Sequence, residues 1–214
     1  MEGNPGLAME KVKRKEREFN VRRSEILDAA VKVFAGKGFY NATVAEIAAA
    51  SGFAIGTLYQ FFDGKEQLYT AMLTEKLAMM YSGIRTAVDG EADIIGKIEL
   101  LVASHFRFIE ENAEFCSIFV RGDYLSLSEG SAELRKRMRH DYAFHVSFIE
   151  AVMRDGTRTG TLKAMDPTMM AAALTGIVNS YASKWLALEE KESLIEKTPV
   201  VLAIFLEGVG KNAP

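Results

Sequence analysis

Apolar residues recur every three or four positions along most of the chain, a spacing that predicts amphipathic helices. The first such stripe begins after residue 22 and comprises Ile26, Ala29, Ala30, Val33 and Phe34. Ser24 stands where it can cap this helix, and Gly36 and Gly38 stand where they can end it. The pattern therefore predicts one helix between residue 22 and these two glycines.

Two shorter helices are predicted next. Thr43 precedes Val44 and stands three residues before Glu46, which is the spacing of a capping box for a helix over residues 44–50. Gly52 is expected to end it, and a second short helix follows over residues 55–61. Asp63 and Gly64 then predict a turn, after which Lys65 opens a longer helix.

The remaining sequence predicts only further amphipathic helices, over residues 93–112, 114–126, 131–154, 168–188 and 193–209. Residues 155–167 contain a cluster of glycine, threonine and proline and predict a turn-rich connection. We therefore expect an all-α fold: an N-terminal three-helix domain followed by a larger helical domain.

The distribution of charge differs between the two ends of the chain. The net charge is −3, whereas residues 11–23 contain seven basic and two acidic residues. Such a run is either a solvated tail or a surface that meets phosphate groups. We expect residues 1–20 to form a basic, flexible arm.

Composition excludes several classes of protein. A single cysteine, Cys116, cannot form an intramolecular disulfide, and the chain contains no apolar run of membrane-spanning length. The three histidines lack a suitably spaced carboxylate for a metal site, and no glycine-rich phosphate loop or nucleophile–base pair is evident. We expect a cytoplasmic protein that is not an enzyme and that has no membrane segment, metal or cofactor.

The two short helices, joined at a glycine, predict a helix-turn-helix. Ile47 and Ala48 of the first helix can pack against Leu58 of the second. The residues left to face the bases in the major groove are Ala54, Gly56, Thr57, Tyr59 and Gln60. Ile55 could face the bases or the core, and the pattern favours the core.

Residues 22–73 resemble the TetR family of bacterial regulators. The resemblance is carried by the stretches TVAEIAAASG from Thr43 and GTLYQFF from Gly56, and by KEQL from Lys65. It implies that Tyr59 and Lys65 contact the DNA backbone and that Arg22 and Arg23 lie near flanking phosphates. It also implies that Thr43 binds a phosphate, caps its helix, or does both. The domains expected are residues 21–67 for DNA binding and 68–214 for effector binding and dimerisation.

The same resemblance implies an effector pocket in the middle helices and a homodimer built from the last two. The candidate effector-binding residues are His105, Phe108, Phe119, Arg121, His145, Phe148, Met170, Asn179 and Tyr181. The candidate dimerisation residues are Leu174, Ile177, Trp185, Val201, Ile204 and Phe205. Each aromatic residue could equally be ordinary core, the histidines could be hydrogen-bonded core histidines, and the last two helices could pack within one chain.

These features predict a homodimeric repressor that binds a near-palindromic operator in double-stranded DNA. A small apolar effector, lipophilic or aromatic, would release it. The alternative is a helical protein-interaction or ligand-carrier module with a weak helix-turn-helix.

Overall fold

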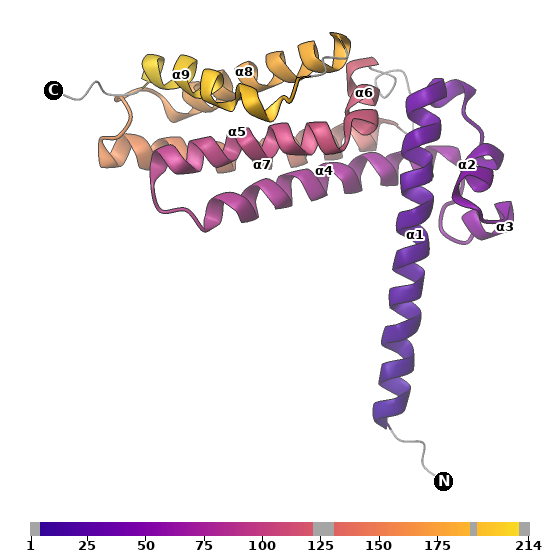
Figure 1. Ribbon diagram of the computed structural model, residues 1–214. Coiled ribbons are helices and arrows are strands. Elements are labelled where there is room, and N and C mark those ends of the chain that lie inside the picture. The colour runs from indigo at the N-terminus through magenta and orange to yellow at the C-terminus, as the bar shows by residue number, and fades with distance from the viewer. Residues whose placement is uncertain (1–4, 122–130, 189–191, 210–214) are drawn as a thin grey trace. The chain divides into compact units, whose positions relative to one another are not determined.

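A computed structural model describes residues 5–121, 131–188 and 192–209 (Figure 1). These residues form α-helices, one 3-10 helix and connecting turns, without a β-strand among them, which confirms the predicted all-α fold. The chain divides into two compact units, Met1–Leu73 and Thr74–Pro214. We call them the N-terminal unit and the C-terminal unit.

The N-terminal unit begins with a helix longer than expected. Helix α1 spans Pro5–Asn41, so Ser24 lies inside the helix and does not cap it. The residues expected to be a flexible arm continue this helix from Pro5, because after Gly6 they are mainly good helix formers and Arg14 pairs with Glu18 one turn later. Gly38 adopts a positive φ of 74° and kinks the helix, whereas Gly36 stays helical.

Two short helices follow α1. Helix α2 spans Val44–Ser51 and ends at Gly52, whose left-handed conformation (φ 74°) suits glycine. Helix α3 spans Ile55–Leu58, shorter than the predicted 55–61, because residues 59–61 form turns. Helix α2 packs against both α1 and α3, and Ile47, Ala48 and Leu58 are buried together with Ile26 and Phe34 of α1 in the core of this unit.

The described residues of the C-terminal unit form the remainder of α4, five later α-helices and the 3-10 helix η2. Their bounds are α4 Lys65–Asp89, α5 Ile94–Glu111, α6 Ala113–Arg121, α7 Ser131–Thr159, α8 Pro167–Leu188, η2 Ile195–Lys197 and α9 Thr198–Val209. Helix α7 continues to Thr159, so residues 155–159 of the connection predicted over 155–167 are helical. The unit boundary at Leu73 lies inside α4, beyond the predicted boundary at residue 67.

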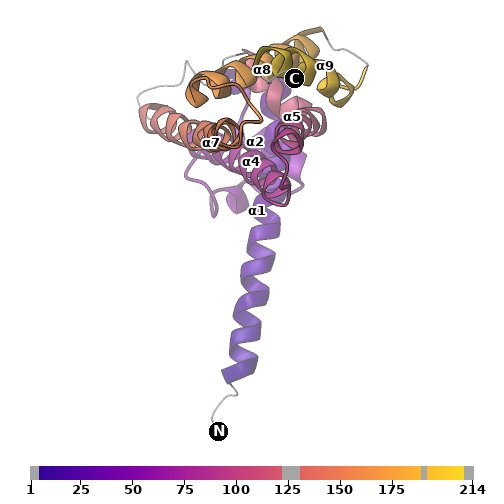
Figure 2. The same cartoon turned by 90° about the vertical axis from the view of Figure 1, so that its left-hand side faces the viewer.

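Helices α8 and α9 lie together on one side of the C-terminal unit, over α5 and α7 (Figures 1 and 2). Ile98, Leu101 and Phe106 of α5 are fully buried against Val201 of α9 and other apolar side chains. The Glu110 carboxylate fastens α5 to η2 by accepting hydrogen bonds from Ser193 Oγ (2.8 Å) and from the backbone N–H of Leu194 and Ile195. No helix in the described part of the chain has the length and apolar character needed to cross a membrane.

Candidate DNA-binding and ligand-binding sites

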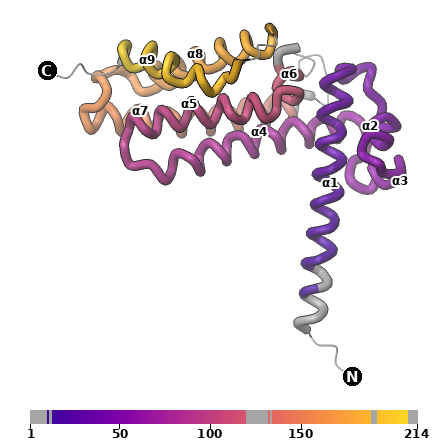
Figure 3. Tube along the Cα trace, in the orientation of Figure 1, coloured from indigo at the N-terminus to yellow at the C-terminus, as the bar shows by residue number. Residues whose placement is uncertain are grey.

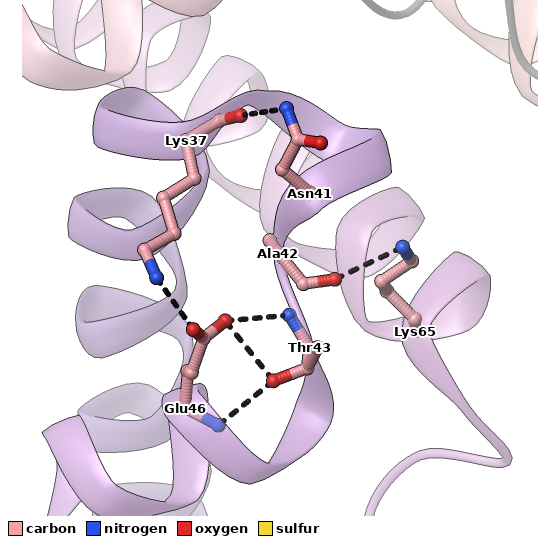
Figure 4. Close-up of polar contacts among 6 residues, drawn as sticks. All are labelled: Lys37, Asn41, Ala42, Thr43, Glu46 and Lys65. Carbon is pink, nitrogen blue, oxygen red and sulfur yellow. Dashed lines mark hydrogen bonds and ion pairs between the residues drawn. The ribbon is translucent and has the colours of Figure 1, made fainter.

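The start of α2 is held by a complete capping box (Figure 4). The Thr43 hydroxyl accepts a hydrogen bond from the Glu46 N–H (3.2 Å), while the Glu46 carboxylate accepts from Thr43 N (3.0 Å). The ion pair with Lys37 and the hydrogen bonds from Thr43 hold the pKa of Glu46 below its usual value. The capping role expected of Thr43 is thus confirmed, and its contact with phosphate stays a prediction.

Lys65 fastens the start of α4 to the end of α1 (Figure 4). Its ammonium group donates hydrogen bonds to the carbonyls of Ala42 (3.0 Å) and Tyr40 (3.2 Å) and lies 4.6 Å from the centre of the Phe39 ring. An ammonium group has three N–H donors, so these two carbonyls leave one donor for a further acceptor. Lys65 can therefore fix the helix and still bind a phosphate.

Helix α3 presents a continuous exposed face. Ala54, Gly56 and Gln60 are exposed, Tyr59 is 55% exposed, and Leu58 alone of the helix is buried. Thr57, also expected on this face, is half-buried. The preference for Ile55 in the core was wrong: its side chain is 46% exposed, since a helix of four residues needs only Leu58 to seal it against α2.

The two arginines expected near flanking phosphates lie on α1. Arg22 is exposed, and Arg23 is half-buried with its guanidinium 5.2 Å from the centre of the Phe62 ring. The ring contact fixes Arg23 against the segment that follows α3.

A cavity of about 530 Å³ lies in the C-terminal unit between α4, α6, α7 and α8. Its lining consists of Leu77, Tyr81, Phe119, Arg135, Met138, Arg139, Tyr142 and Asn179. Arg139 and Tyr142 are exposed, so the cavity reaches solvent along α7. Arg135 and Arg139 stand one helical turn apart on α7, so two arginines contribute to the lining of a mainly apolar space.

Two of the candidate effector residues, His105 and His145, form a buried pair. Their Nε2 atoms are 3.0 Å apart, and His105 Nδ1 is 2.7 Å from the Leu101 carbonyl. Because a carbonyl can only accept, His105 Nδ1 carries the proton, and His145 Nε2 then donates to His105 Nε2. The Tyr81 ring stacks on His145 with ring centroids 4.4 Å apart.

Burial keeps this pair neutral. It lowers the pKa of His105, and burial together with the neighbouring His105 and Arg85 lowers the pKa of His145 to about 3. Burial also raises the pKa of Tyr81 to about 12. Tyr81 lines the cavity and contacts the histidine pair, so it connects the two features.

The other candidate effector residues are divided between the cavity and the core. Phe119 and Asn179 line the cavity, and Asn179 also borders, with His105, a second space of about 10 Å³. Met170 is fully buried in the core, and Phe108, Phe148 and Tyr181 are half-buried and line neither space. The side chain of Arg121 lies outside the described residues.

Three candidate dimerisation residues face inward. Leu174, Val201 and Phe205 are buried within a single chain, because α8 and α9 pack on α5 and α7. Ile177 and Trp185 are half-buried, with Trp185 Nε1 donating to the Glu192 carbonyl (2.8 Å). Ile204 is exposed, as an interface residue must be in a separate chain.

Several residues of the cavity were missed by the sequence analysis. Tyr81 belongs to α4, where no effector-binding residue was expected, and Arg135 and Arg139 of α7 were not among the effector-binding candidates. Their spacing of one turn on an amphipathic helix was the available signal.

Comparison with known families matches both units. The family described as "Bacterial regulatory proteins, tetR family" matches residues 26–72, and the family described as "YsiA-like protein, C-terminal region" matches residues 73–208. The chain is 23% identical over 186 residues to the fatty acid metabolism regulator protein of Bacillus subtilis, covering 86% of this chain and 94% of that protein. It is 28% identical over 180 residues to the transcriptional activator FasR of Mycolicibacterium smegmatis, covering 83% and 79%.

Solved structures agree in fold. The regulator FadR of Bacillus subtilis, in complex with stearoyl-CoA, superposes with a TM-score of 0.73 at 22% identity, covering 86% of this chain and 98% of that one. FadR from Bacillus halodurans superposes with a TM-score of 0.74 at 24% identity and equal coverage. With its helix-turn-helix and its helical C-terminal unit both matched, the chain belongs to the TetR family of bacterial regulatory proteins.

Proposed function

We infer that this protein is a homodimeric transcriptional repressor whose DNA binding is relieved by a long-chain acyl-CoA. The observation that carries the DNA-binding part is the exposed face of α3 beside the buried Leu58. Small residues at Ala54 and Gly56 allow close approach to base edges, and Thr57 and Gln60 can form hydrogen bonds with them. Tyr59, Lys65, Arg22 and Arg23 would bind the backbone phosphates that set the position of the helix.

The cavity supports an acyl-CoA as the effector. Its apolar walls suit an acyl chain, and its volume of about 530 Å³ falls within the range of ligand pockets. Arg135 and Arg139 suit the phosphates of coenzyme A, since guanidinium groups bind phosphate through paired hydrogen bonds. Stearoyl-CoA is the ligand named for one structural relative, and a fatty acid metabolism regulator is among the sequence relatives.

Helix α4 is the element that would carry the response. It begins at Lys65 in the N-terminal unit and contributes Leu77 and Tyr81 to the cavity. A ligand that binds one position of Tyr81 better than another would favour the matching position of α4.

A second copy of the chain would cover the outer faces of α8 and α9. The exposed face of α8 combines small residues that allow helices to approach closely, namely Ala172, Ala173, Gly176, Ser180 and Ser183. Val200 and Ile204 add exposed apolar side chains on α9. Two helices from each copy would then form a four-helix interface about a two-fold axis.

Selection from random duplex DNA at a stated salt concentration tests this function. A palindromic motif with two half-sites should be enriched, because each copy of α3 reads one half-site. If folded protein enriches no motif, the carrier or interaction module is the better account.

A further inference from the structure

The first part of α1 is a basic helix that precedes the segment matched by the TetR family. We call residues 5–22 the N-terminal extension; it runs beyond α2 and α3 (Figure 3). Every described side chain from Lys13 to Arg22 is exposed, and four of the five residues 13–17 are basic. A helix with so little burial and so much like charge gains stability when a polyanion lies against it.

One aromatic contact fixes the rotation of the extension relative to α3. Phe19 is 48% exposed, and its ring lies 4.4 Å, centroid to centroid, from the ring of Phe61. Phe61 follows Tyr59 by two residues, just after α3. The side of the extension that carries Phe19 is therefore the side nearest the segment proposed to contact DNA.

Helical geometry determines which charges share that side. At 3.6 residues per turn, Lys15 precedes Phe19 by one turn and Arg22 follows it by about one turn, so both lie on its side. Glu16 lies toward the same side, whereas Lys13 and Arg17 point away from it. Basic charge thus continues from Arg22 along the extension on the face that Phe19 orients.

We propose that the Phe19 face of the extension binds the phosphate backbone of duplex DNA outside the bases read by α3, with Lys15 as a phosphate ligand. This inference rests on the proposed DNA-binding function. It adds a contact that the helix-turn-helix alone does not supply, one that is independent of base sequence and sensitive to salt.

Charge reversal at two lysines separates this contact from the effect of net charge. Lys15→Glu and Lys13→Glu change the charge equally, two residues apart on the same exposed helix. With the selected duplex as probe, Lys15→Glu should weaken binding about tenfold at 0.1 M salt and reduce the slope of log K against log salt by about one. Lys13→Glu should change the affinity less than about threefold, and circular dichroism should show equal helix content in both variants.

Removal of the ring contact between Phe19 and Phe61 tests the role of Phe19. In a Phe19→Ala background the extension loses its fixed rotation, so Lys15→Glu and Lys13→Glu should become similar in effect. Equal effects of the two lysine variants in the wild-type background, or no effect of Lys15→Glu, would overturn the inference while wild-type DNA binding still supports the proposed function. Absence of any selected duplex for the wild-type protein would remove both.

Discussion

The N-terminal and C-terminal units place their polar groups in contrasting ways. In the N-terminal unit, Thr43 and Glu46 are three residues apart, and Tyr59 stands exposed directly after a helix of one turn. In the C-terminal unit, His105 and His145 come from α5 and α7 and meet in the interior. The first unit suits contact with a large external partner, and the second suits a ligand that enters the protein.

Because of this contrast, we expect substitutions in the two units to affect different properties, DNA binding in the first and stability in the second. Exposed groups on α3 can change without loss of fold, so their substitution should report on DNA alone. Buried groups in the C-terminal unit also support its packing, so their substitution should report on stability as well.

The largest effect is expected from a substitution that leaves the N-terminal unit intact. A Cβ atom at Gly176 would meet nothing within 4 Å in the single chain, so Gly176→Arg should preserve the fold. An arginine there should prevent the close approach of α8 from two copies and produce a monomer. Loss of the second half-site contact should weaken operator binding at least about 100-fold.

Sedimentation velocity and operator titration measure these two outcomes. Gly83→Arg on α4 is the matched control, because Gly83 also has open space around its Cβ position and is exposed. A Gly176→Arg protein that stays dimeric would disprove the proposed interface.

The second largest effect is expected from removing the exposed aromatic ring of Tyr59, directly after α3. Tyr59→Ala should weaken operator binding by about tenfold to a hundredfold, because a backbone contact is lost, while the melting temperature stays close to that of the wild type. Tyr40→Ala is the control, since Tyr40 is a 62% exposed tyrosine of the same unit that lies on α1. Equal binding by the two variants would remove Tyr59 from the DNA interface.

The histidine pair predicts a dependence of stability on pH. The pKa of His145 is about 3 in the folded chain against an ordinary value of 6.5, so below pH 6.5 the unfolded chain binds a proton that the folded chain excludes. The stability that neutral His145 contributes is complete above pH 6.5 and decreases as the pH falls toward 3, with a loss of about 2 kcal/mol at pH 5. His105 acts in the same direction.

Urea unfolding at pH 7.5 and pH 5.0 measures this loss. His145→Gln should make the stability less dependent on pH, because it removes the buried imidazole that excludes a proton in the folded chain. A His145→Gln protein with the wild-type pH dependence would show that the pair is not the titrating element.

A smaller effect is expected at the arginines of the cavity. Arg139→Gln should weaken stearoyl-CoA binding roughly tenfold by removing a charged hydrogen-bond donor to phosphate, and should leave binding of the free fatty acid nearly unchanged. Arg137→Gln is the control, because Arg137 pairs with Asp141 and does not line the cavity. Calorimetry of both ligands decides between a phosphate contact and a general effect on α7.

Sequence reasoning succeeded where structure depends on neighbours in the chain. The capping box at Thr43, the left-handed Gly52 and the start of α4 at Lys65 are all set within a few residues. The prediction that Ile55 is buried was wrong because burial on so short a helix depends on how α3 packs against α2. Hydrophobic spacing along the sequence does not specify that packing. The prediction that Ser24 caps the first helix was wrong because the residues before it are themselves good helix formers and continue the helix toward the N-terminus.

The cavity required tertiary structure. His105 and His145 were both candidates, but their hydrogen bond joins residues forty positions apart. Tyr81 had no distinguishing pattern on α4, and Leu174, Val201 and Phe205 have the same apolar character whether they face their own core or a second chain. Periodicity identifies an apolar face and leaves its partner undefined.

Titration of the protein–operator complex with stearoyl-CoA tests ligand-controlled DNA binding most directly. The anisotropy of a labelled selected duplex should fall as stearoyl-CoA is added. The affinity for the duplex should decrease at least tenfold, which corresponds to a coupling free energy of about 1.4 kcal/mol. Coenzyme A without an acyl chain should have no effect. Unchanged duplex affinity at a concentration of stearoyl-CoA shown by calorimetry to saturate the protein would contradict release by this ligand.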